Sequence, residues 1–171
     1  MKPSVIILDF GSQFTQLIAR EVRSQGVYCE IEPFSIEPSK LQAKQPKALI
    51  LSGGPASFGK RRAPTLTRDI FALNVPVLGI CYGMHLLSHL SSGKLESGKS
   101  REYGHAEIEI LINDGLFAGF EKNQKVAVWM SHGDSVKEVP ANCLVTARST
   151  SCPIAAFQLD HFHAVQFHPE V

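Results

Sequence analysis

The sequence has little charge and no excess of either sign. Charged residues make up 19% of the 171 positions, and 17 Lys and Arg against 16 Asp and Glu leave a formal net charge of +1. A chain this close to neutral has no overall positive field that would hold nucleic acid. Hydrophobic residues make up 44%, which excludes a disordered polyelectrolyte and suffices for one sizeable core. Length and composition together favour a single folded domain.

Long hydrophobic runs are missing as well. The longest uncharged apolar stretch, residues 75–84, contains glycine and cysteine and falls well short of the ~20 residues that span a bilayer. The N-terminal apolar run stops at Asp9, so we expect no signal peptide. We therefore expect no membrane as a partner of this chain.

Cysteines are few and scattered. The chain has four, at positions 29, 81, 143 and 152, and no two form a C-x-x-C pair. This spacing predicts neither a disulfide framework nor a zinc site. A reducing cytoplasm is the simplest compartment, and chemistry at any one cysteine has to be argued from its neighbours.

What the sequence does contain is a change of pattern between its two halves. The first half predicts strands at 5–8, 28–31, 48–51 and 75–80 and helices near 14–22, 66–73 and 82–90. The second half predicts strands alone, at 106–112, 125–130, 144–147, 154–159 and 162–167. Residues 91–101 are rich in Ser, Gly and Lys, so we expect a loop there. The predicted fold class is α/β, a mostly parallel sheet flanked by helices, with an antiparallel strand extension.

The most informative segment is Gly79-Ile80-Cys81-Tyr82-Gly83, which fits G-x-C-x-G between a predicted strand and a predicted helix. Its serine counterpart is the nucleophile elbow, a sharp turn that points the nucleophile outward. Such a turn leaves no room for large neighbours, hence the glycines two positions before and after. At a helix N-terminus the dipole favours a thiolate. The alternative is a structural cysteine buried in a glycine-rich turn.

A thiol nucleophile needs a base, and the best placed of the seven histidines is His168. It follows the last predicted strand, Pro169 restricts the backbone beside it, and Glu170 lies two positions on. A carboxylate there can orient the imidazole as the third member of a triad. The alternative is an ordinary polar surface turn.

Small residues also follow the third predicted strand, in Ser52-Gly53-Gly54-Pro55. We expect the backbone N–H of Gly54 to complete an oxyanion hole with that of Tyr82, the residue after the nucleophile. Residues 54–61 also match the phosphate loop G-x-x-x-x-G-K-[ST] except at the last position, where Arg61 replaces the hydroxyl that binds Mg²⁺. Pro64 would interrupt the helix that a phosphate loop requires, so we favour the oxyanion hole.

Two histidine pairs raise the question of a metal. His85 and His89 lie four positions apart on a predicted helix, and His161 and His163 share one face of a predicted strand. Neither pair has a cysteine or carboxylate at the spacing usual for zinc. We therefore predict no metal and expect His85 to line the pocket beside the elbow.

Taken together, the G-x-C-x-G segment, the Ser-Gly-Gly-Pro loop and the His-Pro-Glu ending resemble the class I (triad) glutamine amidotransferases. Further segments are similar to the amidotransferase domain of the GMP synthase family: residues 8–13, 26–30, 101–104, 128–134, 152–153 and 165–171. The similarity runs from residue 5 to the last residue. It implies the flavodoxin-like class I fold and the hydrolysis of glutamine.

The resemblance also implies roles for individual residues. Cys81 would be the nucleophile, His168 the general base and acid, and Glu170 the carboxylate that orients it. The N–H groups of Gly54 and Tyr82 would hold the oxyanion. Three further residues align with the segment that binds the α-amino and carboxylate groups of glutamine: Ser131, Gly133 and Asp134.

One position departs from the family pattern. The family usually has glutamine four residues after the nucleophile, where it helps to bind the substrate, and this chain has His85 there. An imidazole has a shorter reach and titrates near neutral pH. We therefore expect an altered affinity for glutamine, with some added pH dependence.

For residues 1–171 as a whole, the resemblance implies a glutamine amidotransferase (glutaminase) domain that lacks its C-terminal end. It implies no cofactor on this domain, and ATP and Mg²⁺ on an ATP-pyrophosphatase synthetase domain or subunit that uses the ammonia to convert XMP to GMP. The complete enzyme would be a cytoplasmic homodimer without nucleic acid. The alternatives are another class I amidotransferase, a γ-glutamyl hydrolase with the same triad, and a non-catalytic regulatory domain of the same fold.

Overall fold

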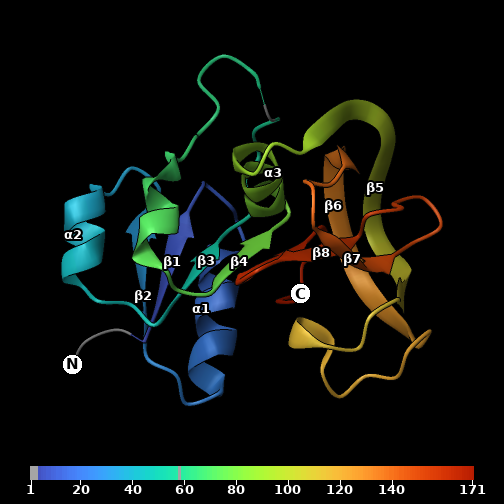
Figure 1. Ribbon diagram of the computed structural model, residues 1–171, viewed down its shortest axis with the longest axis horizontal. Coiled ribbons are helices and arrows are strands. Elements are labelled where there is room, and N and C mark those ends of the chain that lie inside the picture. Colours follow the sequence, from blue (N-terminus) through green and yellow to red (C-terminus); the bar gives the residue numbers. More distant parts are fainter. Residues whose placement is uncertain (1–3, 58) are drawn as a thin grey trace.

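A single sheet of nine strands organises the chain (Figure 1). The computed structural model describes residues 4–57 and 59–171, without the side chains of residues 71 and 98–101. The strands are β1 (Val5–Asp9), β2 (Cys29–Pro33), β3 (Ala48–Leu51), β4 (Val77–Ile80), β5 (Lys94–Ile110), β6 (Lys125–Glu138), β7 (Leu144–Arg148), β8 (Ala156–Leu159) and β9 (Phe162–Val165). The helices are α1 (Thr15–Ser24), α2 (Pro38–Ala43) and α3 (Tyr82–Leu90), with short 3₁₀ helices η1 (Arg68–Leu73) and η2 (Gly115–Phe117).

The sheet changes from parallel to antiparallel along its width. The strands lie in the order β2-β1-β3-β4-β9-β8-β7-β5-β6. β1 pairs in parallel with β2 and β3, β3 with β4, and β4 with β9. The pairings of β9 with β8, β8 with β7, β7 with β5 and β5 with β6 are antiparallel. The predicted α/β fold with an antiparallel extension is therefore confirmed.

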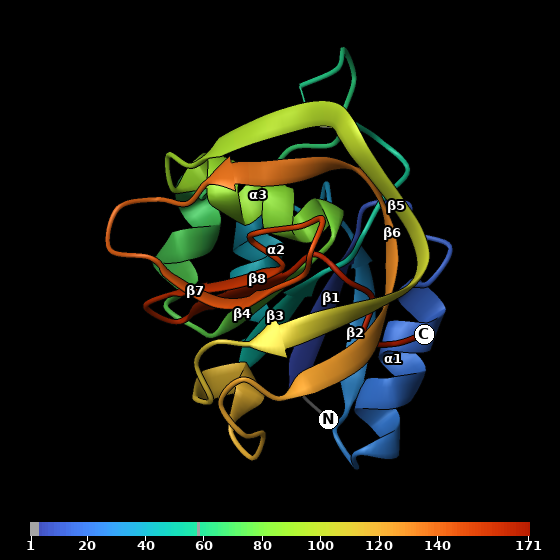
Figure 2. The ribbon, with the colours of Figure 1, turned by 90° about the vertical axis from the view of Figure 1, so that its right-hand side faces the viewer.

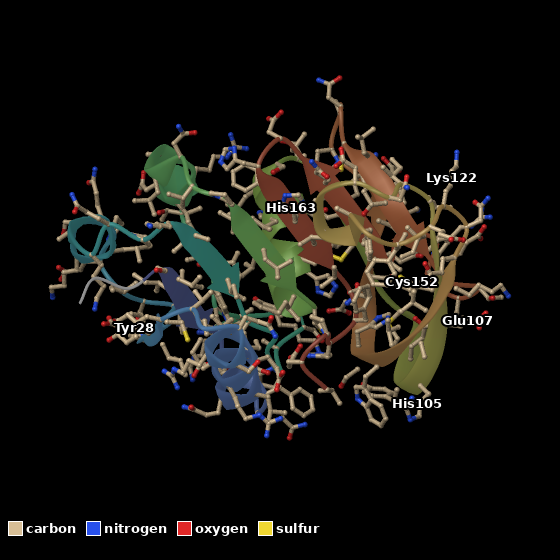
Figure 3. All side chains as sticks on the ribbon, turned by 90° about the horizontal axis from the view of Figure 1, so that it is seen from below. Tyr28, His105, Glu107, Lys122, Cys152 and His163 are labelled. Carbon is tan, nitrogen blue, oxygen red and sulfur yellow. The ribbon has the colours of Figure 1, made fainter. Side chains whose placement is uncertain are left out.

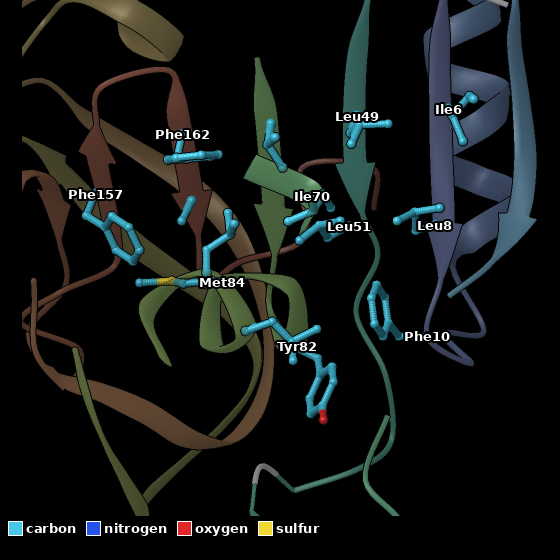
Figure 4. Close-up of a cluster of buried hydrophobic side chains, with 14 of the residues drawn as sticks. Ile6, Leu8, Phe10, Leu49, Leu51, Ile70, Tyr82, Met84, Phe157 and Phe162 are labelled. Atoms are coloured by element: carbon cyan, nitrogen blue, oxygen red, sulfur yellow. The ribbon is translucent and has the colours of Figure 1, made fainter. Parts of the chain in front are cut away.

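The two faces of the parallel part bury separate apolar clusters. Successive side chains of a strand point to opposite faces, so Ile6 and Leu8 of β1 join one cluster and Ile7 joins the other. The first cluster includes side chains of η1 and α3 (Figure 4), together with Leu41 of α2. The second includes Ile18 of α1. Helices thus cover both faces, which is the usual condition of a parallel sheet.

The expectation of a loop at residues 91–101 was wrong from residue 94 on, and only residues 91–93 form a turn. Strand β5 begins at Lys94 and pairs with β6, which itself continues to Glu138, beyond the predicted strand. The two strands form a long bent ribbon (Figure 2), and β6 is the edge strand of the sheet. Because a ribbon that is not buried on both faces needs no continuous apolar pattern, its polar residues carried no strand signal.

The helices are short. α2 has six residues, starts with Pro38 and buries only Leu41, so it is too short to show a helical period and was not predicted. The helix expected around residues 66–73 is the 3₁₀ helix η1. Among the described residues, none of the helices combines the length and apolar character needed to cross a membrane.

Candidate active site

The carboxyl ends of the parallel strands meet at one edge of the sheet and border a cavity of about 710 Å³. Open α/β sheets typically bind their ligands at this edge. Most of the predicted site residues line the cavity: Gly54, Cys81, Tyr82, His85, Ser131, Gly133, Asp134 and His168. Glu170 lies behind His168 instead. The fold therefore brings together segments that follow β3, β4 and β9 with a segment of β6.

Cys81 occupies a strained turn between β4 and α3. Its φ and ψ are 51° and −104°, a conformation of the kind that costs a residue with a side chain about 1–3 kcal/mol. The turn is held from behind, because the N–H of Cys81 donates to the carbonyl of Val165 on β9 at 2.8 Å. Helix α3 starts at the next residue, Tyr82. The sulfur therefore lies at a helix N-terminus, where the dipole favours a thiolate.

The glycines on either side of this cysteine are required by close packing. A Cβ atom on Gly79 would lie 2.6 Å from the backbone of Gly83. A Cβ atom on Gly83 would collide with the carbonyl oxygen of Leu51 on β3. The close packing that the G-x-C-x-G spacing predicts is thus found in the fold. The crowding atoms belong to the backbone, so no side-chain rearrangement could relieve a clash.

His168 and Glu170 form a buried pair. Nδ1 of His168 lies 2.8 Å from Oε1 of Glu170, and the two side chains are 4% and 2% exposed. The backbone N–H of His168 donates to the carbonyl of Trp129 on β6 at 2.8 Å. Burial lowers the pKa of His168, but hydrogen bonds to Cys81 and Glu170, with the charges of these groups, outweigh burial and raise the pKa to about 9. The ring is therefore protonated at neutral pH, and its Nδ1 donates to Glu170.

The ring of His168 and the side chain of Cys81 face the same small space. A Cβ atom on Gly53 would lie 3.0 Å from Cε1 of His168 and 3.6 Å from Cβ of Cys81. The nearby sulfur of Cys81 is one cause of the raised pKa of His168. Because Gly53 has no side chain, these two groups can meet, as a thiolate and an imidazolium must in a cysteine nucleophile.

The predicted oxyanion donors, Gly54 and Tyr82, belong to two segments that both border the cavity with Cys81. A Cβ atom on Gly54 would lie 2.7 Å from the carbonyl oxygen of Phe10, so only glycine lets this loop approach the end of β1 so closely. The phenol of Tyr82 donates to the carbonyl of Pro64 at 2.6 Å, which ties the start of α3 to the loop after β3.

The predicted glutamine-binding residues Ser131, Gly133 and Asp134 form one wall of the cavity. The carbonyl oxygen of Ser131 lies 3.5 Å from the sulfur of Cys81. Asp134 is 8% exposed, and its charge adds to burial in raising the pKa of the Tyr82 phenol. A carboxylate on this wall suits an ammonium group, which offers only hydrogen-bond donors.

His85 lines the cavity, as expected, but its ring is bonded within the protein. Nε2 of His85 lies 3.0 Å from Oε1 of Gln166, and this amide oxygen accepts, so Nε2 carries the proton. Burial lowers the pKa of His85 below its ordinary value, which favours the neutral ring. The added pH dependence that we expect from this position would therefore lie below the ordinary range of histidine.

Two residues that contact the proposed triad, Gln166 and Phe14, were not predicted as site residues. Gln166 is fully buried, and its amide nitrogen lies 3.8 Å from the sulfur of Cys81. Phe14 packs its ring edge against His168, with ring centroids 5.1 Å apart, although its spacing marked it only as a helix-face residue. These contacts join distant parts of the chain, and the one local signal was the position of Gln166 two residues before His168.

The remaining sequence features do not form the sites that they resemble. His89 is exposed. The phosphate-loop pattern borders the cavity with residues such as Ser57 and Lys60, but residues 59–67 continue as turns and irregular chain rather than as the helix of a phosphate loop. Phe58, within that pattern, and the side chain of Arg101 lie outside the described residues. In the described part of the chain, one group of three potential metal ligands lies within 4.8 Å of one another. It consists of Glu102, His132 and Cys152, and neither histidine pair belongs to it.

Comparisons with known proteins agree with this geometry. The family model of class-I glutamine amidotransferases matches residues 6–171. The chain is 50% identical over 169 residues to the glutamine-hydrolyzing GMP synthase of Nitratidesulfovibrio vulgaris, an alignment that covers 98% of this chain and 33% of that protein. It is 45% identical over 173 residues to the protein of the same name from Clostridium perfringens, with 100% and 34% covered. The chain thus spans about a third of the length of these relatives.

Solved structures give a similar result. A protein from Thermoplasma acidophilum that is named as a GMP synthase subunit superposes with a TM-score of 0.84 at 25% identity, covering 100% of this chain and 86% of that chain. A glutamine amidotransferase from Thermotoga maritima has a TM-score of 0.79 at 19% identity, covering 100% and 77%. The second likeness supports the fold alone.

Proposed function

The chain belongs to the class-I glutamine amidotransferase family, and we propose that it is the glutaminase part of a GMP synthase. It hydrolyses glutamine and supplies ammonia to a synthetase part, which uses ATP and Mg²⁺ to convert XMP to GMP. The names and the greater length of its relatives support such a partner. The observation that carries the glutaminase step is the meeting of the Cys81 turn with the His168–Glu170 pair at one cavity.

The reaction begins at the sulfur of Cys81. The helix N-terminus and the protonated ring of His168 stabilise the thiolate, which attacks the side-chain amide carbon of glutamine. The N–H groups of Gly54 and Tyr82 bind the oxyanion that forms. His168 then protonates the amide nitrogen, the C–N bond breaks, and ammonia leaves a γ-glutamyl thioester on the sulfur.

The second half of the reaction restores the enzyme. The neutral ring of His168 takes a proton from water, the oxygen attacks the thioester carbon, and the C–S bond breaks to give glutamate and the thiolate of Cys81. Glu170 accepts from Nδ1 in both halves, so it fixes the ring orientation and stabilises the imidazolium. The wall that contains Asp134 binds the α-amino end of the substrate, which leaves the side-chain amide at the sulfur.

The complete enzyme in this proposal is a cytoplasmic homodimer. All four cysteines are free, which supports a reducing compartment. A glutaminase that ran without its synthetase would waste glutamine, so we expect slow turnover by the 171-residue chain alone and faster turnover when a synthetase part is added.

Ammonia release from glutamine tests the proposal. We expect release that rises on addition of the synthetase part of a close relative, is abolished by Cys81→Ala and is retained by Cys143→Ala, a matched control on a half-buried thiol. With XMP and ATP present, the released ammonia should appear in GMP. Hydrolysis without GMP formation would favour another class I amidotransferase, and no hydrolysis even with the synthetase part would favour a non-catalytic domain.

A further inference from the structure

A second cluster of polar side chains lies where β5 meets β6 and includes His132, a residue of the cavity wall. Nε2 of His132 lies 2.9 Å from Oε2 of Glu102, and Nδ1 lies 3.0 Å from the backbone carbonyl oxygen of Asp134. The side chains of His132 and Glu102 are 1% and 12% exposed. The ring therefore joins a buried carboxylate on one strand to the backbone of the wall on the next.

Both ring nitrogens of His132 face an acceptor. A carbonyl oxygen never donates, so the hydrogen bond to Asp134 needs a proton on Nδ1. The hydrogen bond to Glu102 then needs a second proton, carried either by Nε2 or by the carboxyl group. With Nδ1 protonated, one further proton shared between Glu102 and His132 completes the second hydrogen bond. A hydrogen-bonded network that is satisfied in this way is rigid.

The wall needs such support because the strand pairing fails beside it. The β5–β6 register jumps from Ser97–Asp134 to Glu102–His132, so the residues between on β5 stand opposite Gly133 alone. A bulge of this kind disrupts the ladder of hydrogen bonds and re-aims side chains. The carbonyl of Asp134 lies at this break, and the ring of His132 binds it from behind.

We propose that Glu102 and His132 are positioning residues that hold the Ser131–Asp134 wall in its substrate-binding geometry. The inference rests on the proposed function, because the wall is where the substrate's α-amino end would bind. The pair touches no reacting atom. It acts through the wall, which contacts the nucleophile where the carbonyl oxygen of Ser131 lies 3.5 Å from the sulfur of Cys81.

In the described structure, Cys152, the third member of this cluster, is bonded elsewhere. Burial, with the charge of Glu102, raises the pKa of Cys152 to about 12, so without a metal this thiol stays protonated at neutral pH and is a poor nucleophile. The thiol donates to the carbonyl of Ile154 at 3.3 Å, and both nitrogens of His132 are already bonded. Figure 3 shows Cys152 within the antiparallel part of the molecule and Glu107 at its outer margin.

Substitutions at Glu102 test the role of the pair. Glu102→Ala removes the partner of Nε2, and we expect KM for glutamine to rise about tenfold, the typical effect of one lost buried hydrogen bond, with a much smaller change in kcat. Glu102→Gln should restore most of the affinity, because its amide can donate to Nε2 while Nδ1 keeps its proton for Asp134. Glu107→Gln is the matched control on the same strand, since Glu107 pairs with Lys125 at the surface.

Hydrogen exchange of the backbone amides of residues 131–134 gives a readout that needs no turnover. We expect faster exchange there in Glu102→Ala, near-native exchange in Glu102→Gln, and no change in Glu107→Gln. If the unsubstituted chain hydrolyses no glutamine, the proposed function fails, but exchange still decides whether the pair holds the wall. If glutamine is hydrolysed and Glu102→Ala changes neither KM nor exchange, the positioning role is overturned while the function stands. Stoichiometric zinc in the purified chain would also overturn it.

Discussion

The raised pKa of His168 allows a direct test of how the proposed triad is held together. The pKa lies at about 9 against an ordinary value near 6.5, which favours the protonated ring by about 3 kcal/mol. Burial works in the opposite direction, so Cys81 and Glu170 together contribute more than this figure. Glu170→Gln keeps an oxygen that can accept from Nδ1 but removes the negative charge. If neither partner dominates, the substitution lowers the pKa of His168 by at least about one pH unit.

NMR titration of the imidazole Cε1–H signals from about pH 5 to 11 measures this pKa, with His168→Asn used to assign the signal. We expect titration near 9 in the unsubstituted chain and clearly lower values in both Glu170→Gln and Cys81→Ser. Glu109→Gln is the control, because Glu109 pairs with Arg148 on the surface. A ring that already titrates near its ordinary value, or a pKa that Glu170→Gln leaves unmoved, would refute the reasoning.

Three further predictions follow from the same site. Gly83→Ala forces a Cβ against the backbone of β3, so we expect loss of glutaminase activity and a lower melting temperature; native values would show that the turn has room. His85→Gln should change KM for glutamine by the same factor at about pH 7 and 8, because burial lowers the pKa of His85 and favours its neutral ring; a factor that varies with pH, or no change, would contradict this. Iodoacetamide at about pH 7.5 should label Cys81 first, because burial raises the pKa of Cys143 and Cys152 to about 11 and about 12, leaving few thiolates at either; mass spectrometry after limited labelling checks the order.

The sequence predicted those helices and strands whose buried residues form a recognisable pattern within the element itself. Strand β3 and helix α3 match their predicted bounds, because a short apolar run and a helical period are each visible within one element. The start of β5 and the whole of α2 were missed for the opposite reason. β5 is a strand because β6 pairs with it, and α2 is too short for its one buried residue, Leu41, to form a pattern.

The candidate site divides in the same way. The turn at Cys81 and the neighbouring His168 and Glu170 carry local signatures, namely the glycine spacing and the two-residue interval, and resemblance to a family assigned their roles. Gln166 and Glu102 have no such signature, because their importance depends on contacts 81 and 30 positions away in the sequence. Short sequence motifs therefore predicted the residues of the proposed triad. The residues that hold the site in place could be identified only from the folded structure.

The antiparallel extension is part of the proposed catalytic site, because its strand β6 contacts the proposed catalytic residues. The carbonyl of Trp129 accepts from the backbone of His168, and that of Ser131 lies beside the sulfur of Cys81. The carbonyl of Asp134 is held by His132. Three backbone carbonyls of one strand thus contact the proposed base His168, the nucleophile Cys81 and the positioning residue His132. Since β6 is also an edge strand whose pairing with β5 is interrupted by a bulge, local opening of this strand would disable the site before the parallel core unfolds.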